Sequence, residues 1–284
     1  MSNSYVFSSE LSTFLRLAKS RMEMGFAPVL LLTGVPGAGK TSFATAVAEE
    51  IGATILKHQC TREKSERILY RYDVNGIVTK RNSWIKGPAW KALEASQQGP
   101  IVLLIDEVDK ASDDLNAILL ELLEEFSFSS PEGEKIKGVP ENILVILTSN
   151  GRKELPPEIL RRCQRISVPF PDRDRMTEII DSILKGKIFI PSGMLDLVYK
   201  IGDILRKDND ENSPSPKEMA LLMIDLQGLV LSGESDLQIW REIAASYLTK
   251  EGGAKKIDSV LYQAGQKWNW AKALKSEAQK AWSE

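Results

Sequence analysis

The segment LLLTGVPGAGKTS, residues 30–42, constrains the fold more than any other part of the chain. Its apolar beginning is typical of a buried strand, and three glycines, a lysine and a threonine follow. Residues 34–41 fit the pattern G-x-x-x-x-G-K-[ST], in which backbone N–H groups surround a phosphate. Glycine is required because a Cβ would obstruct both the turn and the approach to phosphate oxygens. The pattern predicts a phosphate-binding loop between a strand and a helix.

Each part of this loop has an expected role toward ATP and Mg²⁺. The positive N-terminus of the following helix would face the phosphates. The Lys40 side chain would reach the β- and γ-phosphates, and the Thr41 hydroxyl would contact Mg²⁺. The expected nucleotide-binding residues of the loop are Gly34, Pro36, Gly37, Ala38, Gly39, Lys40, Thr41 and Ser42.

Strand-like and helical patterns alternate along the first part of the chain. Strands are predicted at residues 28–33, 53–59, 100–106, 142–149 and 165–170, and helices at residues 40–51, 87–98 and 114–125. This alternation predicts an α/β fold, a three-layer sandwich around a parallel sheet. Only helical patterns follow, at residues 173–185, 193–206, 216–231 and 237–248. We therefore expect a nucleotide-binding domain at residues 1–172 and a smaller all-helical lid domain at residues 173–253.

Composition narrows the class of protein and its location. The chain has 284 residues, and its formal net charge of -2 gives no whole-protein field that would attract nucleic acid or an acidic membrane. Cys60 and Cys163 are too few for a disulfide framework, and we find no leader or long apolar run. We expect a cytoplasmic protein without membrane insertion, in which the single histidine, His58, is structural.

The segment IVLLIDEVDK, residues 101–110, predicts the catalytic strand. Carboxylates at the C-terminal edge of a parallel strand lie where open α/β sheets bind ligands. We expect Asp106 to hold Mg²⁺ through water and Glu107 to polarise the attacking water. A solvated strand end is the alternative for an isolated Asp-Glu pair. Asp109 and Lys110 are interpreted as helix-entry residues without a catalytic role.

Polar residues after the next strand complete the expected site. Asn150 follows a buried strand, where its amide would orient the water or touch the γ-phosphate. A short helix from Pro157 ends in Arg161 and Arg162. Two arginines at a helix end can simply balance the helix dipole, but a guanidinium on the surface also suits an arginine finger that acts on a neighbouring subunit.

Three further segments have two interpretations each. Residues 70–86, with Asn75-Gly76, and residues 126–139 predict inserted hairpins, which by pattern alone are surface decoration. Residues 254–284 include an apolar, tryptophan-rich helical face from Leu261 to Trp282. That C-terminal helix would either pack on the lid domain of its own chain or dock onto a partner.

Together these motifs resemble the AAA+ ATPases over roughly residues 10–230, and within them the MoxR-like branch. That branch has a hairpin inserted in helix 2 and another before the strand that carries the sensor asparagine, so the resemblance makes the hairpins working parts. It implies that Arg162 is the better finger and Arg161 the alternate. Lys217 falls where the family usually has the sensor-2 arginine, and Asp-Glu-Val-Asp replaces the usual Asp-Glu-Ile-Asn, which is typical of a divergent subgroup.

The principal functional hypothesis is ATP hydrolysis coupled to remodelling of a partner macromolecule by a ring, expected to be hexameric. The resemblance implies a protein client or a partner with a von Willebrand factor A domain. A nucleotide-gated switch or scaffold is one alternative. Action on DNA or RNA in a bacterial defence or restriction system is another, because Lys80, Arg81, Lys86 and Trp84 would suit nucleic acid. A solvated insert is the favoured interpretation of those four residues.

Overall fold

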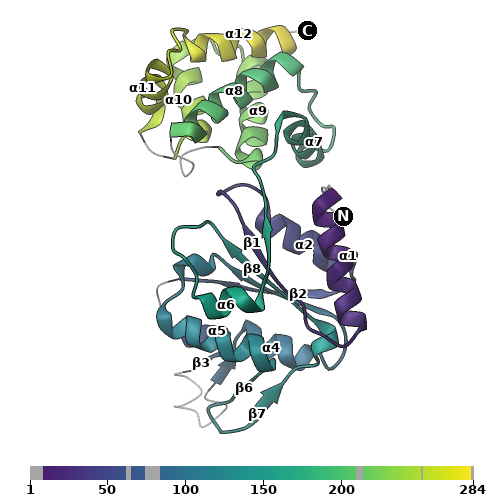
Figure 1. Ribbon diagram of the computed structural model, residues 1–284. Coiled ribbons are helices and arrows are strands. Elements are labelled where there is room, and N and C mark those ends of the chain that lie inside the picture. The colour runs from purple at the N-terminus through teal and green to yellow at the C-terminus, as the bar shows by residue number, and fades with distance from the viewer. Residues whose placement is uncertain (1–8, 62–64, 74–83, 209–213, 251, 283–284) are drawn as a thin grey trace.

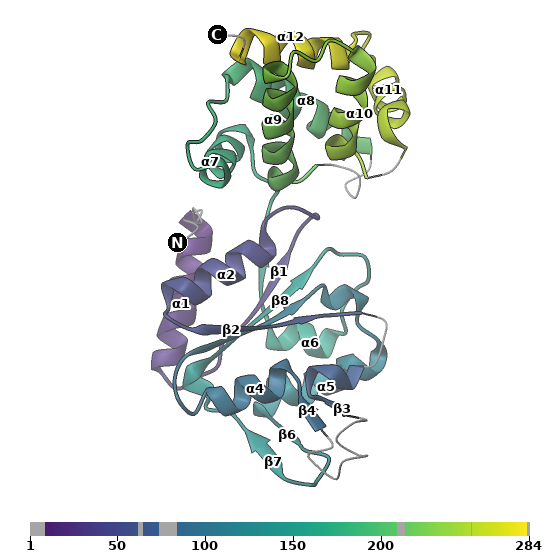
Figure 2. The same cartoon turned by 180° about the vertical axis from the view of Figure 1, so that it is seen from behind.

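The protein folds into an α/β domain and a helical domain joined by one linker, as the computed structural model shows (Figures 1 and 2). The structure describes residues 9–61, 65–73, 84–208, 214–250 and 252–282. Among these residues, no helix combines the length and the apolar character needed to cross a membrane.

Five parallel strands form the central sheet, in the order β2-β5-β8-β1-β9. The strands are β1 (Val29–Thr33), β2 (Thr54–Gln59), β5 (Ile101–Asp106), β8 (Ile143–Ser149) and β9 (Gln164–Ser167). The predicted parallel sheet is therefore confirmed. Strand β9 ends earlier than predicted, before Pro169 and Pro171, because proline has no N–H to donate to a sheet. All five strands end at the same edge.

Helices cover both faces of the sheet because its side chains alternate between them. Leu31, Leu103 and Val145 pack under α4 (Pro88–Ala95), α5 (Asp113–Glu125) and α6 (Pro157–Arg162). Leu30 and Leu104 point to the other face, which α1 (Ser9–Glu23) and α2 (Lys40–Glu50) cover. The result is the three-layer sandwich visible in Figure 1.

Two antiparallel hairpins lie at the end of the α/β domain remote from the helical domain (Figures 1 and 2). One pairs β3 (Tyr70–Tyr72) with β4 (Trp84–Lys86), and the other pairs β6 (Ser127–Ser129) with β7 (Lys135–Lys137). The predicted Asn75-Gly76 turn lies outside the described residues. Trp90 of α4 joins the hairpins, because its ring centroid is 6.4 Å from that of Tyr70 and 5.3 Å from that of Phe128.

In the part of the helical domain that the structure describes, six helices pack around a separate apolar core. These are α7 (Arg173–Leu184), α8 (Ser192–Asp208), α9 (Pro216–Leu231), α10 (Leu237–Leu248), α11 (Gly253–Gln263) and α12 (Trp270–Trp282). Helix α12 contacts α8, α9 and α10.

The single amphipathic helix expected near the C-terminus is wrong, because the chain turns between α11 and α12. Gly265 has φ +72°, a left-handed conformation that ends a helix. Asn269 then accepts a 3.0 Å hydrogen bond from the Lys272 N–H in the first turn of α12. Trp268, assigned to the predicted apolar face, therefore lies in the turn, whereas Trp270 is buried in the core.

Candidate active site

The phosphate loop connects β1 to α2 and is held tightly against the sheet. The Gly34 N–H donates to the Ser149 carbonyl over 3.3 Å. A Cβ at Gly34 would lie 2.2 Å from the Val168 carbonyl oxygen, so the backbone packing admits only glycine. The sequence thus folds this segment into a tight loop that leads directly into α2.

Lys40 occupies the inside of this loop. Its Nζ donates to the carbonyls of Gly34 and Val35 over 2.7 and 2.9 Å. Burial lowers the pKa of Lys40, and the carboxylates of Asp106, Asp109 and Glu107 oppose that shift. Contact with phosphate oxygens would replace the two carbonyl contacts, as the expected role of Lys40 requires.

Thr41 and Asp106 form an oxygen-rich pair at the start of α2. The Thr41 Oγ1 lies 3.2 and 3.1 Å from the two carboxylate oxygens of Asp106. The Thr148 hydroxyl also donates to Asp106 and so fixes its orientation. Mg²⁺ prefers such oxygen ligands and completes its shell with water and substrate phosphate, so the pair fits this ion. Bound Mg²⁺ would neutralise charge on the phosphates.

Glu107 follows directly and adopts a left-handed backbone conformation, with φ 57°. Its N–H donates to the Thr148 Oγ1 over 2.9 Å. Its Oε1 accepts from the Asn150 Nδ2 over 3.1 Å, which places the two predicted residues side by side. Its Oε2 accepts from the Gln59 amide and, over 2.6 Å, from the Lys110 Nζ.

Asp109 and Lys110 lie in a short helical turn, as expected of helix-entry residues, and both also contact residues of the site. Asp109 is buried and accepts from the backbone N–H groups of Asn150 and Arg152 over 3.1 and 3.2 Å. It therefore fixes the loop that presents Asn150. The reason is local: the left-handed turn at Glu107 leads into the short 3₁₀ helix η2 (Val108–Lys110), which folds both side chains back onto the site.

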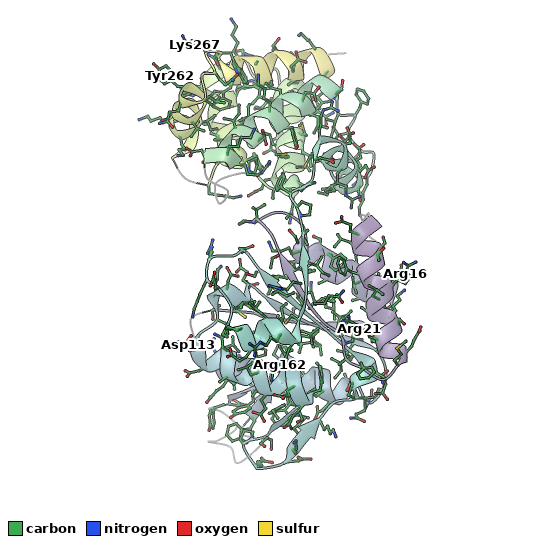
Figure 3. All side chains as sticks on the ribbon, viewed as in Figure 1. Arg16, Arg21, Asp113, Arg162, Tyr262 and Lys267 are labelled. Atoms are coloured by element: carbon green, nitrogen blue, oxygen red, sulfur yellow. The ribbon has the colours of Figure 1, made fainter. Side chains whose placement is uncertain are left out.

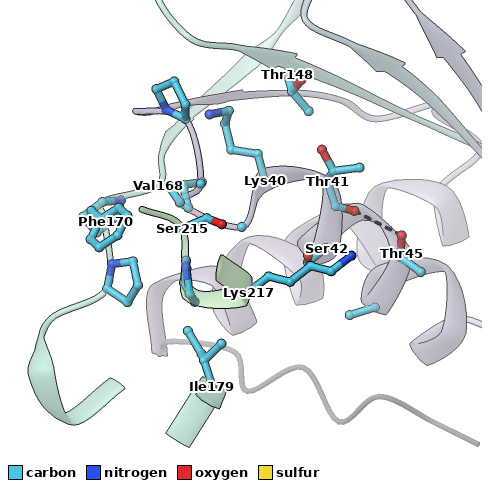
Figure 4. A pocket seen from close by; sticks show the side chains of 18 of the residues that line it. Lys40, Thr41, Ser42, Thr45, Thr148, Val168, Phe170, Ile179, Ser215 and Lys217 are labelled. Atoms are coloured by element: carbon cyan, nitrogen blue, oxygen red, sulfur yellow. Dashed lines mark hydrogen bonds between the residues drawn. The ribbon is translucent and has the colours of Figure 1, made fainter. Parts of the chain in front are cut away.

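A cavity of about 930 Å³ lies between the two domains and is lined by residues 36–42, Asp106 and Lys217, which are the residues predicted to bind nucleotide apart from Gly34. The helical domain contributes Ser215 and Lys217 from the start of α9 and Ile179 from α7. The Lys217 side chain extends along α2 toward Ser42 and Thr45 (Figure 4). Its ammonium has no hydrogen-bond or ion-pair partner among the described residues.

Arg161 and Arg162 end α6, and neither lines this cavity. Figure 3 shows where Arg162 lies on the α/β domain. The Arg162 guanidinium donates to Glu124 of α5 over 2.6 Å and to the Glu158 carbonyl over 2.8 Å. The structure therefore brings the phosphate loop, Asp106, Glu107, Asn150 and Lys217 together, and it leaves the two arginines on another face of the same chain.

Sequence reasoning missed Gln59, Thr148, Asp109 and Lys110. Gln59 had a usable signal, because it ends a strand that pairs with β5, with Gln59 opposite Asp106. Thr148 lies within the fully buried strand β8, and only the pairing of strands reveals that it faces the site.

Comparison with known proteins agrees with this geometry. Residues 29–163 match the family model described as an AAA domain of the dynein-related subfamily. The chain is 28% identical over 199 residues to a Lon protease of Borrelia duttonii, a match that covers 65% of this chain and 22% of the relative. It is 30% identical over 174 residues to a proteasome-activating nucleotidase of Pyrococcus furiosus, covering 56% and 39%. The chain thus spans well under half the length of these relatives.

Proposed function

We propose that this protein is a ring-forming, MoxR-type ATPase that uses ATP and Mg²⁺ and remodels a partner protein. The match of residues 29–163 to the AAA domain model supports this proposal. One observation carries the proposal: the nucleotide cavity and Arg162 lie on different faces of the same chain. A guanidinium placed in this way serves the cavity of a neighbouring copy. Successive copies related head to tail close into a ring, which we propose to be a hexamer.

In this mechanism each side chain of the cavity has one task. Lys40 binds the β- and γ-phosphates, and the Glu107 carboxylate takes the proton of the attacking water while Asn150 orients that water. The water oxygen bonds to the γ-phosphorus as the bond to the β-phosphate oxygen breaks, which releases ADP and phosphate. Lys217 contacts the γ-phosphate as a point charge, without the two parallel hydrogen bonds that arginine makes.

The hairpins supply the contact with a protein client. They lie at the end of the α/β domain remote from the helical domain, and Tyr72 and Ile85 leave 59% and 36% of their surface exposed there. Their positions in the sequence resemble those of the two inserts of the MoxR-like branch. Two relatives are named a protease and a proteasome-activating nucleotidase, which favours a protein over a nucleic acid as client. A von Willebrand factor A domain is the partner that we propose to test first.

Solution mass of the Glu107→Gln protein, with and without Mg-ATP, tests the ring. We expect ATP to convert the protein from monomer to a species near six subunits, because this variant binds nucleotide without consuming it. The same shift should be weaker when Arg162→Ala is added. A protein that stays monomeric with Mg-ATP would contradict the ring and favour a nucleotide-gated switch.

A further inference from the structure

The Lys110 ammonium reaches the Glu107 carboxylate although the two residues are only three positions apart. The left-handed conformation of Glu107 starts the η2 turn, and the Lys110 N–H closes it on the Glu107 carbonyl over 2.9 Å. The side chain of Lys110 then returns to Oε2, 2.6 Å away. Only 34% and 26% of the two side chains are exposed, so solvent weakens this ion pair less than it weakens an open surface pair.

The two carboxylate oxygens of Glu107 have different surroundings. Oε1 accepts from Asn150, and both Glu107 and Asn150 line the nucleotide cavity. Oε2 accepts from Gln59 and Lys110, and neither of these residues lines the cavity. One oxygen is therefore anchored behind the site while the other faces the position of the substrate.

We propose that Lys110 is a positioning residue for ATP hydrolysis, which holds Oε2 so that Oε1 is presented to the attacking water. This inference rests on the proposed role of Glu107 as the base. Without Lys110, Oε2 would keep the exposed Gln59 amide as its partner among the described residues, and the carboxylate would lose the ammonium that is paired with it. Rotation of the carboxylate would then move Oε1 away from hydrogen-bond reach of the water, which a general base requires.

Steady-state ATPase kinetics of Lys110→Met and Lys110→Arg test the proposal. General-base catalysis is worth roughly 10²–10⁴ in rate, so we expect Lys110→Met to lower kcat about tenfold or more with KM unchanged. Lys110→Arg keeps the positive charge, so this variant should retain most of the wild-type kcat. Lys280→Met is the matched control, because Lys280 pairs with Glu277 at the same three-residue spacing over 2.8 Å, in α12. A Lys110→Met protein with wild-type kcat would overturn the proposal.

The same Lys110 substitution in the Glu107→Gln protein distinguishes loss of carboxylate positioning from a general structural effect. Adding Lys110→Met to Glu107→Gln should not change the residual rate, because the carboxylate that Lys110 positions is already gone. An equal loss in both backgrounds would overturn the proposal. A Glu107→Gln protein with wild-type turnover would instead refute Glu107 as the base, and with it the premise of this inference. Lys110→Gln replaces Lys110→Met in both measurements if the methionine variant does not fold.

Discussion

Gly37 of the phosphate loop lies so close to Ser215, at the start of α9, that a side chain on Gly37 would crowd it. A Cβ built on Gly37 would lie 3.0 Å from the Ser215 Cβ and 3.7 Å from the ring of Phe170, which belongs to the linker between the domains. The tip of the phosphate loop therefore lies next to the helical domain, and both line the cavity. The N-termini of α2 and α9 both line the cavity, so the positive ends of both helices would face a bound phosphate.

This close approach predicts that Gly37→Ala weakens ATP binding. Gly37 has φ +80°, where a residue with a Cβ costs about 1–2 kcal/mol, and the added methyl group would also push Ser215 away. We expect ATP affinity, measured by calorimetry, to fall about tenfold or more. Gly25→Ala is the matched control, because Gly25 has φ +85° and open space around it. Equal ATP affinity for Gly37→Ala and wild type would refute this prediction.

Thr148 is predicted to be essential for hydrolysis although it carries no charge. Its hydroxyl donates to Asp106 and accepts from the Glu107 N–H, so one side chain orients both carboxylate residues. Thr148→Val keeps the shape and removes both hydrogen bonds. Losing a hydrogen bond to a charged group costs about 1.5–3 kcal/mol, so kcat should fall about tenfold or more and the Mg²⁺ requirement should rise. Thr148→Ser should retain activity, and a fully active Thr148→Val would contradict the assignment.

Much of the site followed from the sequence because parallel strands bring their ends together. The apolar runs that became β1, β5 and β8 predicted one shared edge, and the edge predicted the proximity of Lys40, Asp106 and Asn150. Thr148 was not predicted because the sequence pattern identifies it only as a residue of a buried strand. The pairing of β8 with β5 brings it to the site. Lys110 escaped because the left-handed backbone at Glu107 has no sequence signature in a residue other than glycine.

In the C-terminal segment, the helical spacing of apolar residues concealed the break between two helices. Apolar residues at helical spacing predicted a continuous helix, yet Gly265 and Asn269 are the residues that end one helix and begin the next. Helix α1 was not predicted either, since its mostly polar residues bury only a narrow stripe that includes Leu11, Leu15 and Ala18.

Trp270 is predicted to be a main stabilising residue of the helical domain. Its side chain is buried and its Nε1 donates to Asp258 over 2.8 Å. Trp270→Ala should lower the free energy of unfolding of this domain by about 3–5 kcal/mol, measured by urea denaturation. Trp268→Ala, which removes a half-buried side chain from the preceding turn, should cost less. Equal free energies of unfolding for the two variants would contradict a main stabilising role of Trp270.

Both cysteines are predicted to resist alkylation in the native protein. Burial, together with Asp106, Asp109 and Glu107, raises the pKa of Cys60 to about 12. Burial also raises the pKa of Cys163 to about 12, against the effect of Arg162. Only about one thiol in ten thousand is then ionised at pH 8, and the thiolate is the reactive form.

Labelling by iodoacetamide, followed by mass spectrometry, checks this prediction. The rate should rise as pH increases toward the raised pKa values, and urea should make both thiols react quickly. Rapid labelling of the folded protein at pH 8 would show that these thiols are accessible and ionised.

Mixing two inactive variants tests most directly whether Arg162 completes the site of a neighbouring copy. Lys40→Ala lacks a working phosphate loop but keeps Arg162, whereas Arg162→Ala keeps the cavity and lacks the guanidinium. In randomly mixed rings about half of the cavities are intact and about half of those face an intact Arg162, so up to about a quarter of wild-type ATPase activity should return, according to how fully the two variants assemble. A mixture no more active than its separate components would contradict the shared site.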